Sequence, residues 1–446
     1  MVPVPSHVKN WRQELRPMLH LATPLALSEL GWMAMGIVDT MFVGRLSAEA
    51  IGAISVGTTV FHTLAICAGG LLLGLDTLVA QAAGAKDRAD SRRSLVNGLW
   101  LAALLIPIVM VAVRLITPAL SGFGVNPDVV DDAVPYISAL NWSTAPLLLF
   151  FALRRYLQSY GAARPIMWTL LGANLVNVAG NWLFVFGNLG APRLGVAGSA
   201  WATFWSRVFM LAALAAVAWY RERDLTSIDW RPDLHRLREI LRLGLPAAGQ
   251  MALEFTVWTA ATVLAGRFAT EVLAGHQIAL MVVSTTFMMP LGISAAAAVR
   301  VGQALGRGDP RGAAHSGWTA VGLGTVVMSC TSVVLLFFPA FVARLFTPDA
   351  AVIAAASPIL RVTAFFQLFD GFQVVVTGAL RGAGDTRTPM LCHFGGYWLL
   401  GFPFGSWLAF GLSMSALGLW MGLSLGVITI GTALLVFWRR AARRFE

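Results

Sequence analysis

Twelve long apolar stretches constrain the fold of this chain more than any other feature of its sequence. A helix needs about 20 mostly apolar residues to cross a bilayer, and stretches longer than about 25 residues indicate tilt or an extension into the cytoplasm. The twelve stretches are 18–44, 51–83, 94–116, 128–158, 165–187, 196–219, 240–265, 271–304, 312–338, 349–380, 389–408 and 416–438. We therefore expect an all-α polytopic membrane protein with twelve transmembrane helices.

The composition excludes several other classes of protein. Hydrophobic residues make up 57% of the chain and charged residues 12%, whereas soluble domains carry about 25% charged residues. These proportions exclude a soluble enzyme, a disordered chain and a nucleic-acid-binding protein with a basic face. The cysteines Cys67, Cys330 and Cys392 lie inside apolar stretches without Cys-x-x-Cys or Cys/His spacing, so we expect neither disulfides nor structural zinc.

The basic residues predict the orientation in the membrane. Twenty-five of the 32 Lys and Arg residues lie in the connections that follow even-numbered stretches or in the terminal segments. The positive-inside rule therefore places both termini in the cytoplasm. Residues 1–17 are polar and lack a cleavable apolar core, so we expect one cytoplasmic tail there and a second at 439–446. The predicted location is the plasma membrane, that is, a bacterial inner membrane.

The second half of the chain repeats the first at an offset of 222 residues. The matching residues are Pro24 with Pro246, Gly44-Arg45 with Gly266-Arg267, Glu49 with Glu271, and Gln81-Ala82 with Gln303-Ala304. Each half holds six stretches, an even number, so both have the same orientation and form a parallel internal repeat. We expect two six-helix lobes, 18–219 and 239–438, joined by a charged cytoplasmic linker, 220–238. This plan is typical of alternating-access carriers; a two-lobed channel or a scaffold is the alternative.

Five acidic residues lie inside the apolar stretches. They are Glu29, Asp39, Asp76, Glu254 and Asp370. A carboxylate at the centre of a bilayer costs about 2.5–3.5 kcal/mol on an insertion scale, so it is retained because it is paired, faces water or has a function. We expect only Arg207 and Arg361 to offer intramembrane counter-charge. The excess of negative charge would attract cations into a central cavity and disfavour anions.

Asp39 is the candidate cation or proton site of the first lobe. Asn174, Asn177 and Asn181 follow one narrow helical stripe, and amide oxygens can bind Na+ or relay a proton through water. Thr203 is a weaker candidate for the same site. The alternative is that Asp39 pairs with a neighbouring helix for structure, and that the asparagines only hold helices together.

Glu254 and Asp370 are the candidate coupling residues of the second lobe. Two carboxylates that lie close together either bind a cation or share a proton, and an oxygen-rich site suits Na+ or H+ better than a transition metal. Separate structural pairs, such as Asp370 with Arg361, are the alternative. Those two residues are nine positions apart, or about 13 Å along a helix, which disfavours that pair.

The remaining intramembrane acids are weaker candidates. Glu29 could line the cavity. Asp76 lies toward the cytoplasmic end of its stretch. We expect it to have a structural role there, capping a helix or pairing with loop arginines, rather than a role in transport. No cofactor is expected, because the chain has no Walker loop and no His-Glu-x-x-His or Gly-x-Ser-x-Gly motif. These absences also argue against direct coupling to ATP and against an enzyme.

Several motifs resemble those of the multidrug and toxic compound extrusion (MATE) family. They are Val38-Asp39-Thr40 with Gly44, Val79–Ala85 (VAQAAGA), Asn177–Gly187 (NVAGNWLFVFG), Gly195–Thr203 (GVAGSAWAT) and Leu380–Asp385 (LRGAGD). The resemblance covers residues 18–438. Acids at Asp39, Glu254 and Asp370 resemble its NorM-type branch. That resemblance implies that Glu254 and Asp370 couple transport to a cation, with Na+ as one candidate ligand, and that Asp39 and the span 5 asparagines form a second ion site.

The resemblance and the acids together predict a secondary active multidrug efflux transporter. It would exchange organic, often cationic, amphipathic compounds for Na+ or H+. The coupling ion stays open, because Leu75-Asp76-Thr77 resembles eukaryotic members of the family, which implies proton exchange. We expect small-molecule drugs and dyes and membrane lipids as partners, no nucleic acid, and a monomer.

Two rival functions remain. A flippase for lipid-linked oligosaccharides would need basic cavity residues for pyrophosphate, which the excess of acids disfavours. A non-transporting membrane receptor or scaffold should tolerate neutralisation of the core acids.

Overall fold

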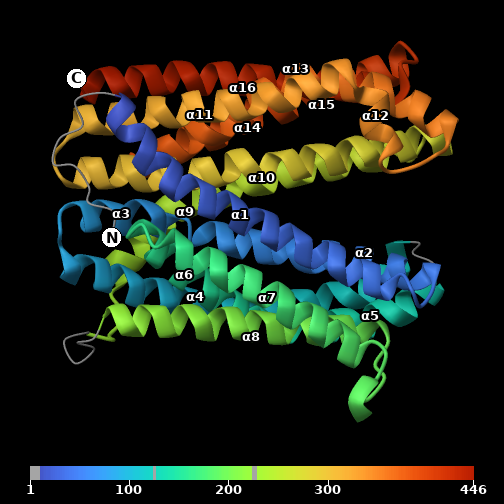
Figure 1. Cartoon of the computed structure of the whole chain (residues 1–446), viewed down its shortest axis with the longest axis horizontal. Helices are drawn as coiled ribbons and strands as arrows, with labels where there is room; N and C mark the ends of the chain where they lie inside the picture. Colours follow the sequence, from blue (N-terminus) through green and yellow to red (C-terminus); the bar gives the residue numbers. More distant parts are fainter. Residues whose placement is uncertain (1–10, 124–126, 223–228, 446) are drawn as a thin grey trace. The chain divides into compact units, whose positions relative to one another are not determined.

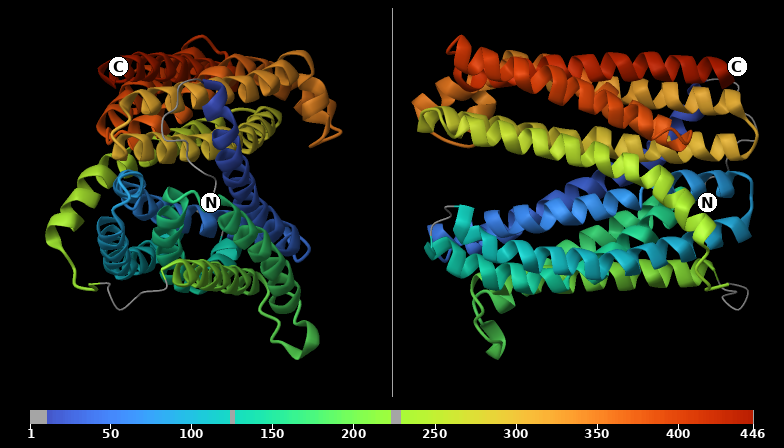
Figure 2. Two further views of the ribbon diagram at one scale, coloured as in Figure 1. Left: turned by 60° about the vertical axis from the view of Figure 1, so that its left-hand side comes forward. Right: turned by 180° about the vertical axis from the view of Figure 1, so that it is seen from behind.

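The computed structural model describes residues 11–123, 127–222 and 229–445, and almost all of them are helical (Figure 1). No strand occurs in these ranges, so the predicted all-α class is confirmed. The chain divides into two compact units. We call residues 27–248 the N-unit, and residues 1–26 together with 249–446 the C-unit. Within each unit the axes of the long helices are roughly aligned with one another, whichever way the chain runs (Figure 2).

The N-unit holds the end of α1, the helices α2 to α8 and the start of α9. The bounds of these elements are α1 Trp11–Val43, α2 Ala48–Leu71, α3 Gly74–Gly84, α4 Arg88–Ile116, η1 Thr117–Phe123, α5 Pro127–Trp142, α6 Thr144–Ser159, α7 Ala163–Phe184, η2 Asn188–Gly190, α8 Val196–Arg221 and α9 Leu234–Ala265. Two of its apolar stretches are broken. The second is divided into α2 and α3, and α5 meets α6 at a bend of 45°.

The C-unit holds the start of α1, the end of α9 and all later helices. The bounds of the later elements are α10 Thr270–Gly306, α11 Pro310–Phe337, α12 Pro339–Arg344, α13 Ala350–Gly382, α14 Arg387–His393, η3 Phe394–Gly401, α15 Phe402–Ser406, η4 Trp407–Gly411 and α16 Ser415–Phe445. The long helices α10 and α13 are continuous, whereas η3 and η4 are short π-helices inside the segment that begins with α14.

The helices of the two units pack in corresponding ways. In the N-unit, α5 packs against α2 and α8, and α6 against α4. In the C-unit, α13 packs against α10, α16 and α11. Because α5 and α6 together correspond to α13 in the repeat, each unit is built around its fourth apolar stretch. The internal repeat expected from the sequence is therefore present in the packing as well.

The first helix of each half is divided between the two units, and small residues explain how it packs. A Cβ on Gly70 would lie 2.7 Å from the Cα of Ala248, and a Cβ on Gly292 would lie 2.4 Å from the Cα of Ala26. The two contacts are equivalent in the repeat, because Gly70 and Gly292 are 222 residues apart, and so are Ala26 and Ala248. The backbones touch because neither glycine has a side chain. Residues 11–26 of α1 thus pack in the C-unit, and residues 234–248 of α9 in the N-unit.

The π-helix η3 is also explained by glycine packing. A π-helix forms hydrogen bonds between residues five apart, so Gly396 and Gly401 lie on the same face. A Cβ on Gly396 would lie 2.9 Å from the Gly426 carbonyl oxygen, and a Cβ on Gly401 would lie 3.0 Å from the Gly422 carbonyl oxygen. The π-helical turn therefore keeps both glycines against α16.

The described helices agree with most of the expected membrane spans. Eight of them are long and apolar enough to cross a membrane, and the bent pair of α5 and α6 adds a ninth candidate. The other three expected stretches, 165–187, 240–265 and 389–408, coincide with α7, with part of α9 and with the segment from α14 to η4. The count of twelve transmembrane helices stays a prediction.

Candidate functional site

Asp39 lies where three helices of the N-unit meet. Its carboxylate accepts hydrogen bonds from Asn177 Nδ2 at 2.9 Å, Asn181 Nδ2 at 2.7 Å and the Thr203 hydroxyl at 2.8 Å. Asp39 is only 6% exposed, and both asparagines are completely buried. Residues four apart lie on one face of a helix, so both asparagines of α7 reach Asp39 on α1, while Thr203 comes from α8. The structure thus brings together four of the residues predicted for this site.

The donors around Asp39 are all neutral. No basic side chain forms an ion pair with it among the residues that the structure describes. The amide oxygens of Asn177 and Asn181 are buried, and neither accepts a hydrogen bond from the described chain. An amide carries its donor and its acceptor on one group that can turn. The same two side chains can therefore offer N–H groups to a bare carboxylate or, after turning, oxygens to a cation beside it.

Asn174 lies on the same stripe of α7 but does not reach Asp39. Its amide donates to the carbonyl oxygen of Gly31 at 2.8 Å and to that of Leu170 at 2.9 Å. It therefore connects α7 to α1 about two turns from Asp39. For this one asparagine, the structure agrees with the alternative of a hydrogen bond between helices.

Glu254 and Asp370 lie at the same level of the C-unit. Trp258 on α9 packs against Phe366 on α13, with 5.9 Å between the ring centroids. Glu254 is one turn before Trp258, and Asp370 is one turn after Phe366. Because α9 and α13 run in opposite directions (Figure 2), both acids are displaced from this aromatic contact toward the same end of the unit.

A polar network connects both acids to the segment that contains α14 and η3. The Gln373 amide donates to Asp370 Oδ1 at 2.9 Å and to the Tyr397 hydroxyl at 3.3 Å. His393 Nε2 lies 3.9 Å from Glu254 Oε2. Asp370 Oδ2 and Gln373 Oε1 are buried and accept no hydrogen bond from the described chain. Gln373, Tyr397 and His393 were not predicted from the sequence, although Gln373 lies three residues from Asp370 on the same helix.

A cluster of aromatic side chains lies one helical turn from both acids of the C-unit. Trp258 packs against Tyr397 at 6.5 Å and against Trp420 at 5.2 Å between centroids. The Trp420 indole donates to His276 Nδ1 at 3.0 Å, and His276 Nε2 lies 3.0 Å from the Thr262 hydroxyl. Both ring nitrogens of His276 thus have partners, which favours a structural role for this histidine.

The other two intramembrane acids are paired with arginines. Glu29 forms an ion pair with Arg154, and their side chains are 14% and 4% exposed. Asp76 is fully buried in the first turn of α3, 3.5 Å from Arg155. Sequence reasoning counted both arginines with the cytoplasmic connections, whereas the structure places them inside α6. Both arginines therefore supply counter-charges beyond Arg207 and Arg361. Asp39, Glu254 and Asp370 form no ion pair with an arginine among the described residues, and we call them the unbalanced acids.

Comparison with known proteins decides the family. The MatE family model matches two segments, residues 24–183 and 246–407. This chain belongs to the MatE family. The two matched segments correspond to the two halves of the repeat, and they contain all three unbalanced acids. The predicted family and the two-lobed repeat are both confirmed.

Curated relatives in this family are similar over nearly their whole length. The probable multidrug resistance protein NorM of Mesorhizobium japonicum is 36% identical over 444 residues, covering 97% of this chain and 95% of its own. The multidrug resistance protein NorM of Burkholderia vietnamiensis is also 36% identical, covering 94% and 92%.

Solved structures show the same fold. The eukaryotic MATE transporter AtDTX14 aligns with a TM-score of 0.85 at 21% identity, covering 98% of both chains. An outward-facing multidrug resistance MATE family transporter of the MOP superfamily aligns with a TM-score of 0.86 at 20% identity, covering 99% of both chains. The agreement extends over both units of this MatE protein.

Proposed function

We propose that this MatE protein is a secondary active multidrug efflux transporter. It exports organic, often cationic, amphipathic compounds in exchange for Na+ or H+. The relatives named multidrug resistance proteins, with more than nine-tenths of both chains aligned, support the export of drugs. The buried carboxylates of both units support coupling to a cation.

The observation that carries the proposal is the contrast between Asp39 and Glu29. Both lie on α1 in the N-unit, but only Glu29 has an arginine partner, Arg154. A buried carboxylate kept for structure is normally neutralised by an opposite charge. Asp39 instead has neutral donors and two unused amide oxygens beside it. This arrangement fits a carboxylate that exchanges its counter-charge during transport.

Either ion fits the chemistry of the site. A proton on Asp39 would turn an acceptor into a donor, and the oxygens of Asn177 and Asn181 could accept from it. Sodium would be bound by Asp39 together with these amide oxygens, since oxygen ligands suit a hard cation. In the C-unit, Glu254 and Asp370 would bind the same ion between them or share one proton.

Exchange requires that ion and drug favour different conformations of the protein, because only a difference in affinity shifts an equilibrium between states. Cationic compounds are attracted by the unbalanced acids when these carry no ion. Trp258 is only partly buried, so its ring offers a flat apolar surface that accepts drugs of varied shape, while the fully buried Tyr397 and Trp420 rings support it from behind. Ion binding would discharge the acids and release the drug.

The proposal includes the arrangement in the membrane. The chain is a multi-pass protein of the inner membrane, and the basic connections place both termini in the cytoplasm. One chain contains both sites, so a monomer is sufficient for transport.

Transport in proteoliposomes tests this function. The full-length protein is reconstituted, and uptake of a cationic dye and of a fluoroquinolone is measured under a sodium gradient or a pH gradient, one at a time. Transport driven by either gradient supports the proposal and identifies the ion. Absence of transport under both gradients would overturn it, and a lipid pyrophosphate would then be tested as the substrate of a flippase.

A further inference from the structure

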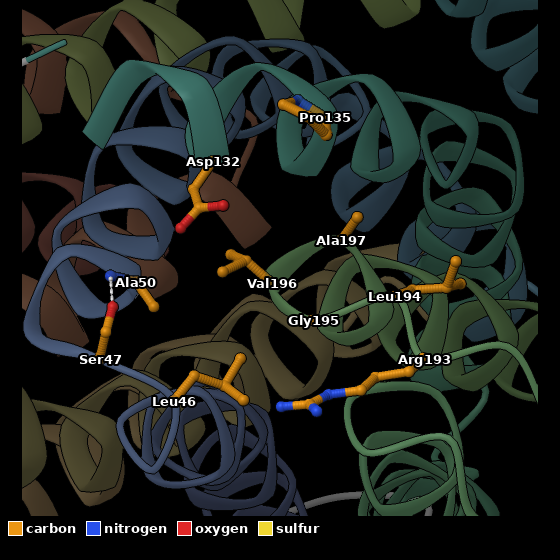
Figure 3. Close-up of a pocket in the computed structure, with 10 residues that line it drawn as sticks. All are labelled: Leu46, Ser47, Ala50, Asp132, Pro135, Arg193, Leu194, Gly195, Val196 and Ala197. Atoms are coloured by element: carbon orange, nitrogen blue, oxygen red, sulfur yellow. Dashed lines mark hydrogen bonds between the residues drawn. The ribbon is translucent and has the colours of Figure 1, made fainter. Parts of the chain in front are cut away.

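A cavity of about 290 Å³ lies in the N-unit, apart from the acids described above. Ten residues line it, as Figure 3 shows: Leu46, Ser47, Ala50, Asp132, Pro135, Arg193, Leu194, Gly195, Val196 and Ala197. They belong to the connection between α1 and α2, the first turn of α2, the second and third turns of α5, and the connection into α8 with its first residues. Because these segments lie near helix ends, we expect the cavity at the depth of lipid headgroups rather than in the hydrocarbon core.

Two opposite charges line this cavity without neutralising each other. The Asp132 carboxylate comes from α5, and the Arg193 guanidinium comes from the segment before α8 (Figure 3). Within the described residues, neither side chain forms an ion pair or a hydrogen bond. The volume corresponds to about ten water-sized groups, which is enough for a small polar molecule.

The charges determine which molecule fits. A simple anion bound to Arg193 would be repelled by Asp132, and a simple cation bound to Asp132 would be repelled by Arg193. A molecule with an anionic and a cationic end satisfies both residues at once. Guanidinium groups bind phosphate and carboxylate through two parallel hydrogen bonds, and a primary amine can donate to a carboxylate.

We infer that this cavity binds a small zwitterion that carries a phosphate or carboxylate at one end and a primary amine at the other. Arg193 binds the anionic end and Asp132 the ammonium. The phosphoethanolamine headgroup of a membrane lipid has this chemistry, and so does the same group free in solution. The site is separate from the ion-coupling acids and does not depend on the proposed transport function.

The test uses the full-length protein in nanodiscs. Free phosphoethanolamine is titrated into protein held in phosphatidylcholine nanodiscs, and binding is measured by calorimetry. In a second arm, native mass spectrometry measures how much phosphatidylethanolamine and how much phosphatidylcholine stay bound to the protein. Phosphatidylcholine is the comparison because the quaternary ammonium of choline cannot donate a hydrogen bond to Asp132. Binding of the free compound identifies a solute site, and selective retention of the lipid identifies a headgroup site; either supports the inference.

Four variants locate the binding. Asp132→Asn and Arg193→Gln should each weaken binding about tenfold, the effect of losing roughly 1.4 kcal/mol from one charged contact. Asp131→Asn and Arg114→Gln remove exposed charges of the same sign that do not line the cavity, and should leave binding within about twofold. Thermal unfolding of each variant shows whether it is folded. Absence of binding in both arms, or equal losses in the control variants, would overturn the inference. Neither arm uses an ion gradient, so failure here is distinguishable from failure of transport.

Discussion

The two units surround their buried carboxylates with different chemical groups. In the N-unit, a single acid, Asp39, is held by amides and a hydroxyl from two other helices. In the C-unit, two acids on different helices, Glu254 and Asp370, lie near a cluster of aromatic rings. Gln373 donates to Asp370, and His393 lies 3.9 Å from Glu254. The repeat therefore conserves the packing of the helices but not the chemistry of the sites. One unit surrounds its acid with hydrogen-bond donors, and the other brings two acids together.

The difference predicts that the C-unit is the more sensitive of the two. Asp370→Asn or Glu254→Gln should reduce gradient-driven transport to the level of empty liposomes. Each variant leaves a single carboxylate, which can no longer bind the ion together with a second acid. Transport by these reconstituted variants is compared with transport by the control Asp131→Asn, which removes an exposed aspartate of α5. Wild-type transport by either variant would show that the coupling ion does not bind there.

Breaking the arginine pair of α1 should affect stability rather than coupling. Arg154→Met leaves Glu29 as an unpaired buried charge, which should lower the free energy of unfolding by about 3–5 kcal/mol. The double variant that also carries Glu29→Gln should recover most of this loss. Thermal unfolding in detergent measures both, with the exposed Arg164→Met as control. If Arg154→Met unfolds like the wild type, Glu29 and Arg154 do not form a buried pair.

A smaller effect is expected when Asp39 loses one of its three donors. Thr203→Val removes the hydroxyl that donates at 2.8 Å and should lower transport about five- to tenfold, since one such bond contributes about 1–1.5 kcal/mol. Thr203→Ser keeps a hydroxyl and should retain most activity. Equal transport by the serine and valine variants would show that the Thr203 hydroxyl does not contribute to the Asp39 site.

The smallest effect concerns charge pairs near the starts of α1 and α9. Glu14 on α1 is fully buried and accepts two hydrogen bonds of 2.6 Å from Arg300 in the C-unit. Asp233, just before α9 in the N-unit, pairs with Arg93 at a more exposed position. The hydrogen bond from Arg93 holds the pKa of Asp233 below its ordinary value of 3.8.

The sign of the pH effect follows from the lowered pKa of Asp233. Its contribution to stability is present above pH 3.8 and is lost as the pH falls through the lowered pKa. Asp233→Asn should therefore unfold at a lower temperature than the wild type at neutral pH, and the difference should disappear in strong acid. A difference that is constant with pH would mean that ionisation of Asp233 does not stabilise the N-unit. High salt should also reduce the difference, because the pair is exposed.

The sequence predicted much of the fold and part of the site. The offset of 222 residues already relates Gly70 to Gly292, and the structure shows why both must be glycine. The stripe of asparagines predicted that α7 faces Asp39, because helical spacing defines a face. Spacing does not say which residues of the facing helix each side chain reaches, so the contact of Asn174 with Gly31, two turns from Asp39, could not be predicted. The pairing of Glu29 with Arg154 was missed for the same reason.

The division of the chain into units was also beyond the sequence. The charged linker suggested a boundary at 220–238, whereas the compact units divide within α1 and α9. A helix that is continuous in sequence gives no sign that its two ends pack with different neighbours. Only the reciprocal contacts of Gly70 with Ala248 and of Gly292 with Ala26 reveal it.

Exchange of ion for drug is the central claim, and ion movement caused by drug tests it most directly. Proteoliposomes are loaded with Na+ or with acidic buffer, with no drug inside, and a cationic dye is added outside while the internal ion concentration is recorded. If the protein exchanges ion for drug, dye uptake releases one of these ions, and Asp370→Asn abolishes this release. Dye uptake with no movement of either ion would contradict it, because the protein would then carry drugs without exchange.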